Sequence, residues 1–198
     1  MSGSDDGTEM TLRDGRRVII RPVTPADGAS LLAFYRALPE EDRLFLRDDV
    51  TRPEWLERFL RRMDLGELTS LIALHEGVVT GETSLYRARH GWTRHVGEMR
   101  LAVAPEYRRA GLGTALARSL TKWAIDEGVD KLVAQVVENQ LPALRTLEKL
   151  GFNHEATLRN HVVDVRGFKR DLLVFANDIS HIWESMEALV ADYPPQGE

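Results

Sequence analysis

Apolar positions in the first third of the chain recur at helical spacing behind two helix-start signals. Thr24-Pro25-Ala26-Asp27 combines a Thr cap, Pro at the first helical position and an acid in the first turn. Thr51-Arg52-Pro53-Glu54 reads as a capping box with Pro inside it. The spacing predicts one helix that Pro39 stops and a second that continues to Met63. A short apolar run at 18–20 predicts a strand before them.

The apolar pattern changes its period at Ser70, where runs of strand length replace the helical spacing. Turn residues separate these runs, so this part of the chain is predicted to be an antiparallel meander. Helical periodicity returns at Leu112, and Gly128 ends that helix. Together the segments indicate a mixed α/β sheet. The expected strands are 71–75, 78–86, 96–103, 132–137, 156–165 and 172–176, and a further helix is expected at 142–150.

The two ends of the chain differ from the domain between them. Residues 1–10 are small, polar and acidic, and we expect a disordered leader there. Asp178 can cap a C-terminal helix with one apolar stripe, which we expect to dock on its own domain; a dimer contact or a lid is the alternative. The expected divisions are the leader at 1–10, one domain at 11–177, and the helix and tail at 178–198, with Ile182, Trp183, Met186, Leu189 and Val190 in the stripe.

Composition narrows the classes of function. The 198 residues suit a single domain, and 26 basic against 31 acidic residues give a net charge of −5. A mildly acidic chain is a poor candidate for general nucleic-acid binding, and we expect neither a membrane span nor a secretory signal. The lack of cysteine excludes disulfides, thiolate metal sites and a cysteine nucleophile, so a cytoplasmic protein is expected.

The sequence contains neither the zinc-binding nor the serine-nucleophile motif of a hydrolase. His75-Glu76 and His154-Glu155 each lack the second histidine of a zinc-protease pair, so we expect no metal. No Gly-x-Ser-x-Gly motif marks a serine nucleophile.

The stretch from Leu101 to Thr114 carries the clearest chemical signal. A predicted strand runs into a loop in which Arg108 and Arg109 precede Gly111 and Gly113 at the start of a helix. Glycines let backbone N–H groups approach a ligand, and a helix N-terminus attracts an anion. We therefore predict a phosphate or pyrophosphate site, with a tight turn that binds nothing as the alternative. The dinucleotide and Walker A motifs match poorly, because the third glycine and the lysine that they need are absent.

Two separated motifs resemble the GNAT superfamily of N-acetyltransferases. Arg108-x-x-Gly111-x-Gly113, preceded by Leu-x-Val-x-Pro-x-Tyr-Arg, looks like the coenzyme A pyrophosphate motif of that family. Val137-Glu138-Asn139 and the helix that ends in Glu148-Lys149-Leu150-Gly151-Phe152 resemble its later motif. The resemblance covers about residues 10–177. It implies a central, mostly antiparallel twisted sheet of about seven strands flanked by helices, here with an added C-terminal helix.

The resemblance implies direct transfer of an acetyl group from acetyl-CoA to an amine, which fits a chain without cysteine. Backbone groups of the glycine-containing loop should hold the pyrophosphate, and the preceding strand should pair with the pantetheine arm. Glu98 occupies the place of the general base in protein lysine acetyltransferases of this superfamily, and Glu82 is the second candidate. The residues expected to bind acetyl-CoA are Leu101, Ala102, Val103, Arg108, Arg109, Ala110, Gly111, Leu112, Gly113, Thr114 and Asn139.

The sequence departs from the family at the residue that protonates the departing thiolate. Many members have a tyrosine there, and this chain has Leu147. A thiol with a pKa of about 8.5 is a tolerable leaving group, so the thiolate can leave unassisted or be protonated by another hydroxyl or by water. Tyr107 carries a hydroxyl, but its place in the loop favours a structural role.

The expected amine acceptor follows from the opening of the chain. Residues 12–22, Leu-Arg-Asp-Gly-Arg-x-Val-x-Ile-Arg-Pro, are similar to the catalytic domain of bacterial protein lysine acetyltransferases, so a protein lysine is expected. Glu155-Ala156-x-Leu158-Arg159 resembles the branch that acetylates N-terminal amines, which leaves a protein N-terminus or a small-molecule amine as alternatives. Because Leu147 replaces the tyrosine that protonates the thiolate, a non-catalytic sensor that binds acyl-CoA is an alternative of a different class. The expected partners are acetyl-CoA and the acceptor, with a homodimer as an option and neither nucleic acid nor membrane.

Overall fold

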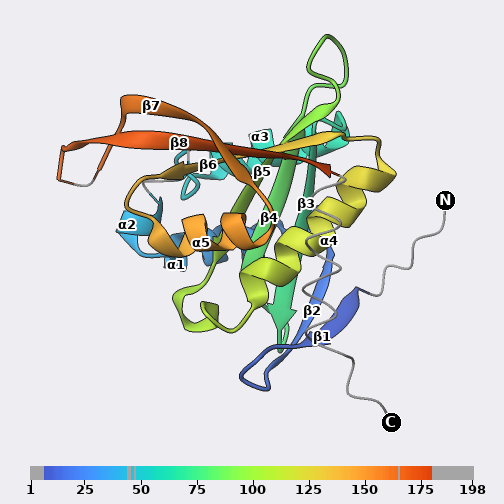
Figure 1. Cartoon of the computed structure of the whole chain (residues 1–198). Helices are drawn as coiled ribbons and strands as arrows, with labels where there is room; N and C mark the ends of the chain where they lie inside the picture. The colour runs from blue at the N-terminus through green and yellow to red at the C-terminus, as the bar shows by residue number, and fades with distance from the viewer. Residues whose placement is uncertain (1–6, 44–45, 47, 165, 180–198) are drawn as a thin grey trace.

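The chain folds around one eight-stranded sheet flanked by helices (Figure 1). The computed structural model describes residues 7–43, 46, 48–164 and 166–179. The strand order is β1-β2-β3-β4-β5-β6-β8-β7, which confirms the expected mostly antiparallel α/β sheet and adds one strand to it. The strands are β1 (Thr8–Thr11), β2 (Arg17–Pro22), β3 (Leu68–His75), β4 (Val78–Arg87), β5 (Val96–Val103), β6 (Lys131–Val137), β7 (Asn153–Val163) and β8 (Lys169–Asp178).

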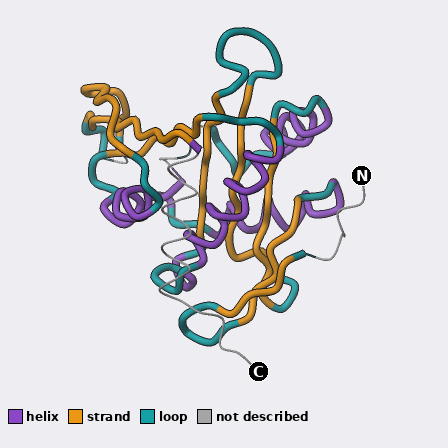
Figure 2. The backbone as a smooth tube through the Cα atoms, turned by 45° about the vertical axis from the view of Figure 1, so that its right-hand side comes forward, coloured by secondary structure: helices purple, strands orange, loops and turns teal. Residues whose placement is uncertain are grey.

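Helices cover both faces of the sheet, as Figures 1 and 2 show from two directions. On one face lie α4 and α5, over a core that contains the fully buried Leu112, Leu116 and Leu120 of α4. On the other face lie α1 and α3, whose Tyr35 and Trp55 rings meet edge to face at 4.9 Å. The helices are α1 (Gly28–Ala37), α2 (Glu40–Arg43), α3 (Pro53–Asp64), α4 (Leu112–Asp126) and α5 (Leu141–Lys149), with short 3-10 turns η1 (Pro25–Asp27) and η2 (Pro105–Tyr107).

The sheet opens between β5 and β6, which are its parallel neighbours. Their register pairs Val96 with Lys131 and Glu98 with Val133, and within the described residues the ladder ends there. On its other side β5 stays paired with β4 as far as Val103, and β6 stays paired with β8 as far as Val137. The two strands therefore diverge after Glu98, and we call the gap between Met99–Val103 and Ala134–Val137 the split.

Two local predictions near the N-terminus are wrong. Residues Thr8–Met10 belong to β1 rather than to a disordered leader, because they pair with β2 in antiparallel register. Arg52 rather than Thr51 is the cap of α3, and the Thr51 hydroxyl instead donates to Asp49 at 2.6 Å. The first six residues of the expected leader lie outside the described part of the chain.

The predicted C-terminal helix also falls largely outside the described residues, which end at Ile179. Asp178, its expected cap, is the last residue of β8, and the N–H of Ile179 donates to the Asp130 carbonyl at 2.8 Å. None of the helices in the described ranges is long and apolar enough to span a bilayer.

Candidate active site

The glycine loop, residues 104–114, connects β5 to α4 at the open end of the split. Gly111 caps α4 with a φ of 92°, a left-handed conformation that glycine adopts without the steric cost of a side chain. Arg109 has a φ of 62°, which is unusual for a residue with a side chain. The first N–H groups of a helix find no partner within it, so those of Leu112–Thr114 are suited to hold an anion.

The two glycines of this loop are needed for different reasons. Gly113 is not in the left-handed region, and a Cβ atom there would meet only the side chains of Leu101 and Val103, at 3.5 and 3.7 Å. Those are ordinary contacts, so neither backbone conformation nor packing requires glycine at 113. A small residue at this position keeps space open between the first turn of α4 and the end of β5.

The arginines of the loop do not act as a pair. The exposed side chain of Arg108 donates to the Val103 carbonyl at 3.2 Å and to the Asp42 carboxylate at 2.6 Å, which ties the loop to α2. Arg109 is exposed, whereas Ala110 and Leu112 are buried. Asn139 is exposed in the turn after β6, and since β5 and β6 run in parallel, this turn and the glycine loop follow the same ends of the two strands.

Glu98 lies where the split begins, on the face of the sheet that α1 and α3 cover. It is directly opposite Tyr86 of β4, and its carboxylate accepts a hydrogen bond from Arg100 Nε at 3.0 Å. About a quarter of the Glu98 side chain is exposed, 24%. The Arg100 guanidinium also stacks on the Tyr86 ring at 4.0 Å and reaches Asp48 at 3.5 Å. The sequence allows Glu98 to be a solvated strand residue paired with Arg100 or Arg94, and the structure shows the pair with Arg100, which strand alternation places on the same face.

Glu82 occupies a different environment. It is 1% exposed, and its carboxylate accepts hydrogen bonds from Tyr35 Oη at 2.7 Å, from Ser70 Oγ at 2.5 Å and from Ser84 Oγ. Burial raises the pKa of the Glu82 carboxyl, although the three hydroxyl bonds oppose that shift. Sequence reasoning did not find these partners, because the Tyr35 hydroxyl comes from a helix 47 residues away.

The two glutamates named from the sequence lie at different positions along the sheet. Glu82 is opposite Ala102 and Glu98 is opposite Tyr86, so they are separated by four residues along the sheet. At about 3.4 Å per residue, the backbone positions of the two residues are roughly 14 Å apart along the sheet. Only Glu98 is partly open to solvent.

Two residues that bear on the leaving thiolate have packing roles. Leu147 is 5% exposed and belongs to the core beneath α4, so no acid can act from its position. The Tyr107 ring contacts the Arg16 guanidinium at 3.9 Å and meets the His75 ring edge to face at 5.8 Å. In the described part of the chain, no three His, Asp or Glu side chains are arranged to hold a metal ion.

Comparisons with known proteins agree with this geometry. The model of the Acetyltransferase (GNAT) family matches residues 31–152. Phosphinothricin N-acetyltransferase of Streptomyces viridochromogenes is 31% identical over 147 residues, which cover 73% of this chain and 79% of that protein. The ribosomal protein bS18-alanine N-acetyltransferase of Escherichia coli is 36% identical over 80 residues, 40% of this chain and 53% of that enzyme.

A solved structure shares both the fold and detectable sequence identity. A protein from Salmonella typhimurium, determined with its cofactor acetyl-CoA, superposes with a TM-score of 0.70 at 25% identity. The superposition covers 82% of this chain and 94% of that one. The matched family model spans more than half of the chain and includes both β5 and the glycine loop. The chain therefore belongs to the GNAT family and is an acetyl-CoA-dependent N-acetyltransferase.

Proposed function

We propose that acetyl-CoA lies in the split and that Glu98 is the general base that prepares the acceptor amine. The split is the observation that supports this best, because β5 has no strand partner on its β6 side from Met99 to Val103 in the described residues, and the glycine loop follows it directly. The two amides of an extended pantetheine arm hydrogen-bond to such an edge as a peptide strand does. The N–H groups at the start of α4 then receive the pyrophosphate.

The reaction uses residues at the two ends of the split. With the pyrophosphate at the glycine loop, the thioester lies towards Glu98. The Glu98 carboxylate removes a proton from the acceptor ammonium, and the nitrogen lone pair attacks the thioester carbonyl carbon. A C–N bond forms and the C–S bond breaks, and the sulfur leaves as a thiolate with the bonding electrons. Because Leu147 offers no proton, that thiolate takes its proton from water.

A protein lysine remains our proposed acceptor, on the similarity of residues 12–22 to protein lysine acetyltransferases. A small-molecule amine is the second candidate, because the chain covers 79% of an enzyme named for phosphinothricin, which is itself an amine. A protein N-terminus is the third, since the shorter match is to an enzyme named for a ribosomal-protein alanine. The cytoplasmic location also stays a prediction.

A thiol-release assay with three acceptor classes tests both the reaction and the acceptor. Lysine peptides blocked at the N-terminus, lysine-free peptides with a free N-terminal alanine, and phosphinothricin are each offered with acetyl-CoA. We expect CoA release to depend on the acceptor and to be fastest with the lysine peptides. Faster turnover of either other class would replace lysine as the acceptor. Tight CoA binding with no release for any amine would instead indicate a sensor.

A further inference from the structure

The turn between β1 and β2, residues 12–16, packs against the outside of the glycine loop. Leu12 is 4% exposed and anchors the turn in the core beneath α4. The N–H of Arg13 donates to the Ala110 carbonyl at 3.0 Å. Arg16 Nη2 donates to the Glu106 carbonyl at 2.6 Å, at the other end of the loop. The turn therefore holds the loop at two carbonyl groups that flank Arg108 and Arg109.

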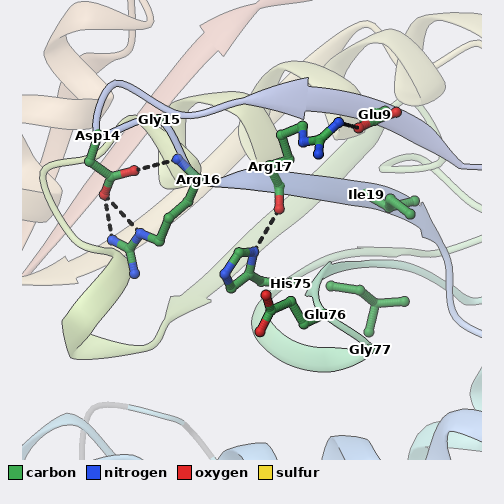
Figure 3. A pocket seen from close by; sticks show the side chains of 10 residues that line it. Glu9, Asp14, Gly15, Arg16, Arg17, Ile19, His75, Glu76 and Gly77 are labelled. Carbon is green, nitrogen blue, oxygen red and sulfur yellow. Dashed lines mark hydrogen bonds and ion pairs between the residues drawn. The ribbon is translucent and has the colours of Figure 1, made fainter.

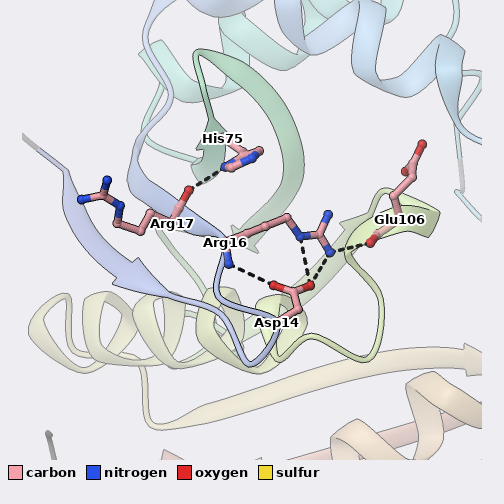
Figure 4. Close-up of polar contacts among 5 residues, drawn as sticks. All are labelled: Asp14, Arg16, Arg17, His75 and Glu106. Carbon is pink, nitrogen blue, oxygen red and sulfur yellow. Dashed lines mark hydrogen bonds and ion pairs between the residues drawn. The ribbon is translucent and has the colours of Figure 1, made fainter.

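The Arg16 side chain is itself held in place (Figure 4). Asp14 accepts from its Nε at 2.9 Å and from Nη2 at 2.5 Å, and these bonds hold the pKa of the Asp14 carboxyl below its usual range. The guanidinium plane lies over the Tyr107 ring at 3.9 Å. Arg17 makes different contacts, as Figure 3 shows. Its side chain pairs with Glu9, and its carbonyl oxygen is hydrogen-bonded to His75 Nδ1 at 2.7 Å.

These contacts set the direction of the backbone groups that face a ligand. The carbonyl of Ala110 and the N–H of Gly111 belong to the same trans peptide, so they point in opposite directions. Because Arg13 holds that carbonyl, the N–H of Gly111 is directed away from the turn. The left-handed backbone of Arg109 is costly by itself and persists only where surrounding contacts impose it.

We infer that Arg16 is a positioning residue for the acyl donor: it keeps the glycine loop in the conformation that receives the pyrophosphate, without touching acetyl-CoA. This inference rests on the proposed placement of the pyrophosphate. It assigns a binding role to a residue that neither belongs to the loop nor lies near the reacting atoms. Its effect should appear only for donors that carry a pyrophosphate.

Two donors and two adjacent arginines test the inference. Acetyl-CoA is compared with S-acetylpantetheine, which has the same thioester arm but no pyrophosphate or nucleotide. Arg16→Ala should raise KM for acetyl-CoA about tenfold, the effect of losing one charge-assisted hydrogen bond, and should leave kcat within twofold. The kcat/KM for S-acetylpantetheine should not change. Arg17→Ala is the matched control, since the Arg17 side chain is 77% exposed and pairs with Glu9. This variant should leave kcat/KM unchanged for both donors.

The conservative variants keep the test valid if Arg16→Ala folds poorly. Arg16→Lys retains the positive charge but lacks the planar guanidinium group with its several donors. Asp14→Asn keeps Arg16 but weakens the hydrogen bonds that fix its side chain. Each variant should raise KM for acetyl-CoA by about threefold. An equal loss with both donors would overturn the inference, as would an unchanged KM in every variant. A wild-type enzyme that used both donors with equal kcat/KM would instead refute the proposed pyrophosphate site.

Discussion

Replacing Glu98 with Gln should remove the general base and leave the site otherwise intact. Gln keeps the size of the side chain, and its carbonyl oxygen can accept the hydrogen bond that Arg100 Nε now donates at 3.0 Å. The side chain is partly exposed rather than part of a closed polar network, so the substitution should leave the fold unchanged. The amide cannot take a proton from the acceptor, and the change is therefore specific to that step.

The expected loss follows from the amine. A free lysine amine has a pKa of about 10.4, so at pH 7 only about 1 molecule in 2,500 is neutral, a cost of roughly 4.6 kcal/mol. A positioned base typically contributes a factor of about 10² to 10⁴ in rate. The variant should lower kcat at pH 7 by at least about tenfold, and the deficit should shrink as pH rises towards the pKa of the amine.

The assay follows CoA release at saturating acetyl-CoA across that pH range, with CoA affinity measured separately by calorimetry. Glu82→Gln is the matched control, because Glu82 is roughly 14 Å from Glu98 along the sheet and closed from solvent. Affinity for CoA should be nearly the same in both variants. Full activity of Glu98→Gln at pH 7, together with a loss in Glu82→Gln, would show that Glu82 is the base and that the reasoning is wrong.

Four further variants address the framework of the site and of the domain. Glu82→Ala should lower the free energy of unfolding in urea by about 3 kcal/mol, since it leaves a cavity and three unpaired buried hydroxyls; a loss below about 1 kcal/mol would contradict this. Because burial raises the pKa of Glu82, wild-type stability should fall as pH rises from 4.5 through the folded-state pKa, and Glu82→Gln should flatten that slope. Gly113→Trp should fold but bind acetyl-CoA poorly in calorimetry, and unchanged affinity would remove the pyrophosphate from this loop. Hydrogen bonds from Arg21 hold the pKa of Asp27 far below 3.8, so Tm should drop as pH falls below 3.8. Asp27→Asn should lower Tm at pH 7 and make that acid slope shallower.

The sequence predicts those parts of the site whose signals are local. The run from β5 through Gly111 to α4 is one continuous segment, and its glycines, strand pattern and helix start all agree. The meander and the later helix were predictable for the same reason. Element boundaries shifted by a few residues, as at β7, which begins at Asn153 rather than near 156.

Contacts between distant segments could not be predicted in this way. Nothing local indicates that Arg16 reaches the Glu106 carbonyl, 90 residues later. Strand β1 forms because it pairs with the edge of β2 and its Met10 packs against the core beneath α4, and both are contacts between separate segments. The cap of α3 lies at Arg52, one residue after Thr51, and the Thr51 hydroxyl donates to the Asp49 carboxylate before the helix begins. That Glu82 is a buried acceptor for three hydroxyl groups likewise depends on its burial, which strand alternation alone does not reveal.

The short ladder between β5 and β6 also divides the sheet into two units that can open independently. β6, β8 and β7 are joined to the other five strands through only three described residue pairs. Further links are the hydrogen bond from Asp130 N–H to the His95 carbonyl and the shared apolar core beneath α4 and α5. Local opening should therefore occur first at this junction, and the amides of Ala134–Val137 should exchange with deuterium faster than those in the centre of β4. Acetyl-CoA bound to both β5 and β6 would join the two units for as long as it stays bound. Adding CoA should slow exchange on both sides of the junction together, which couples substrate binding to the cohesion of the whole domain.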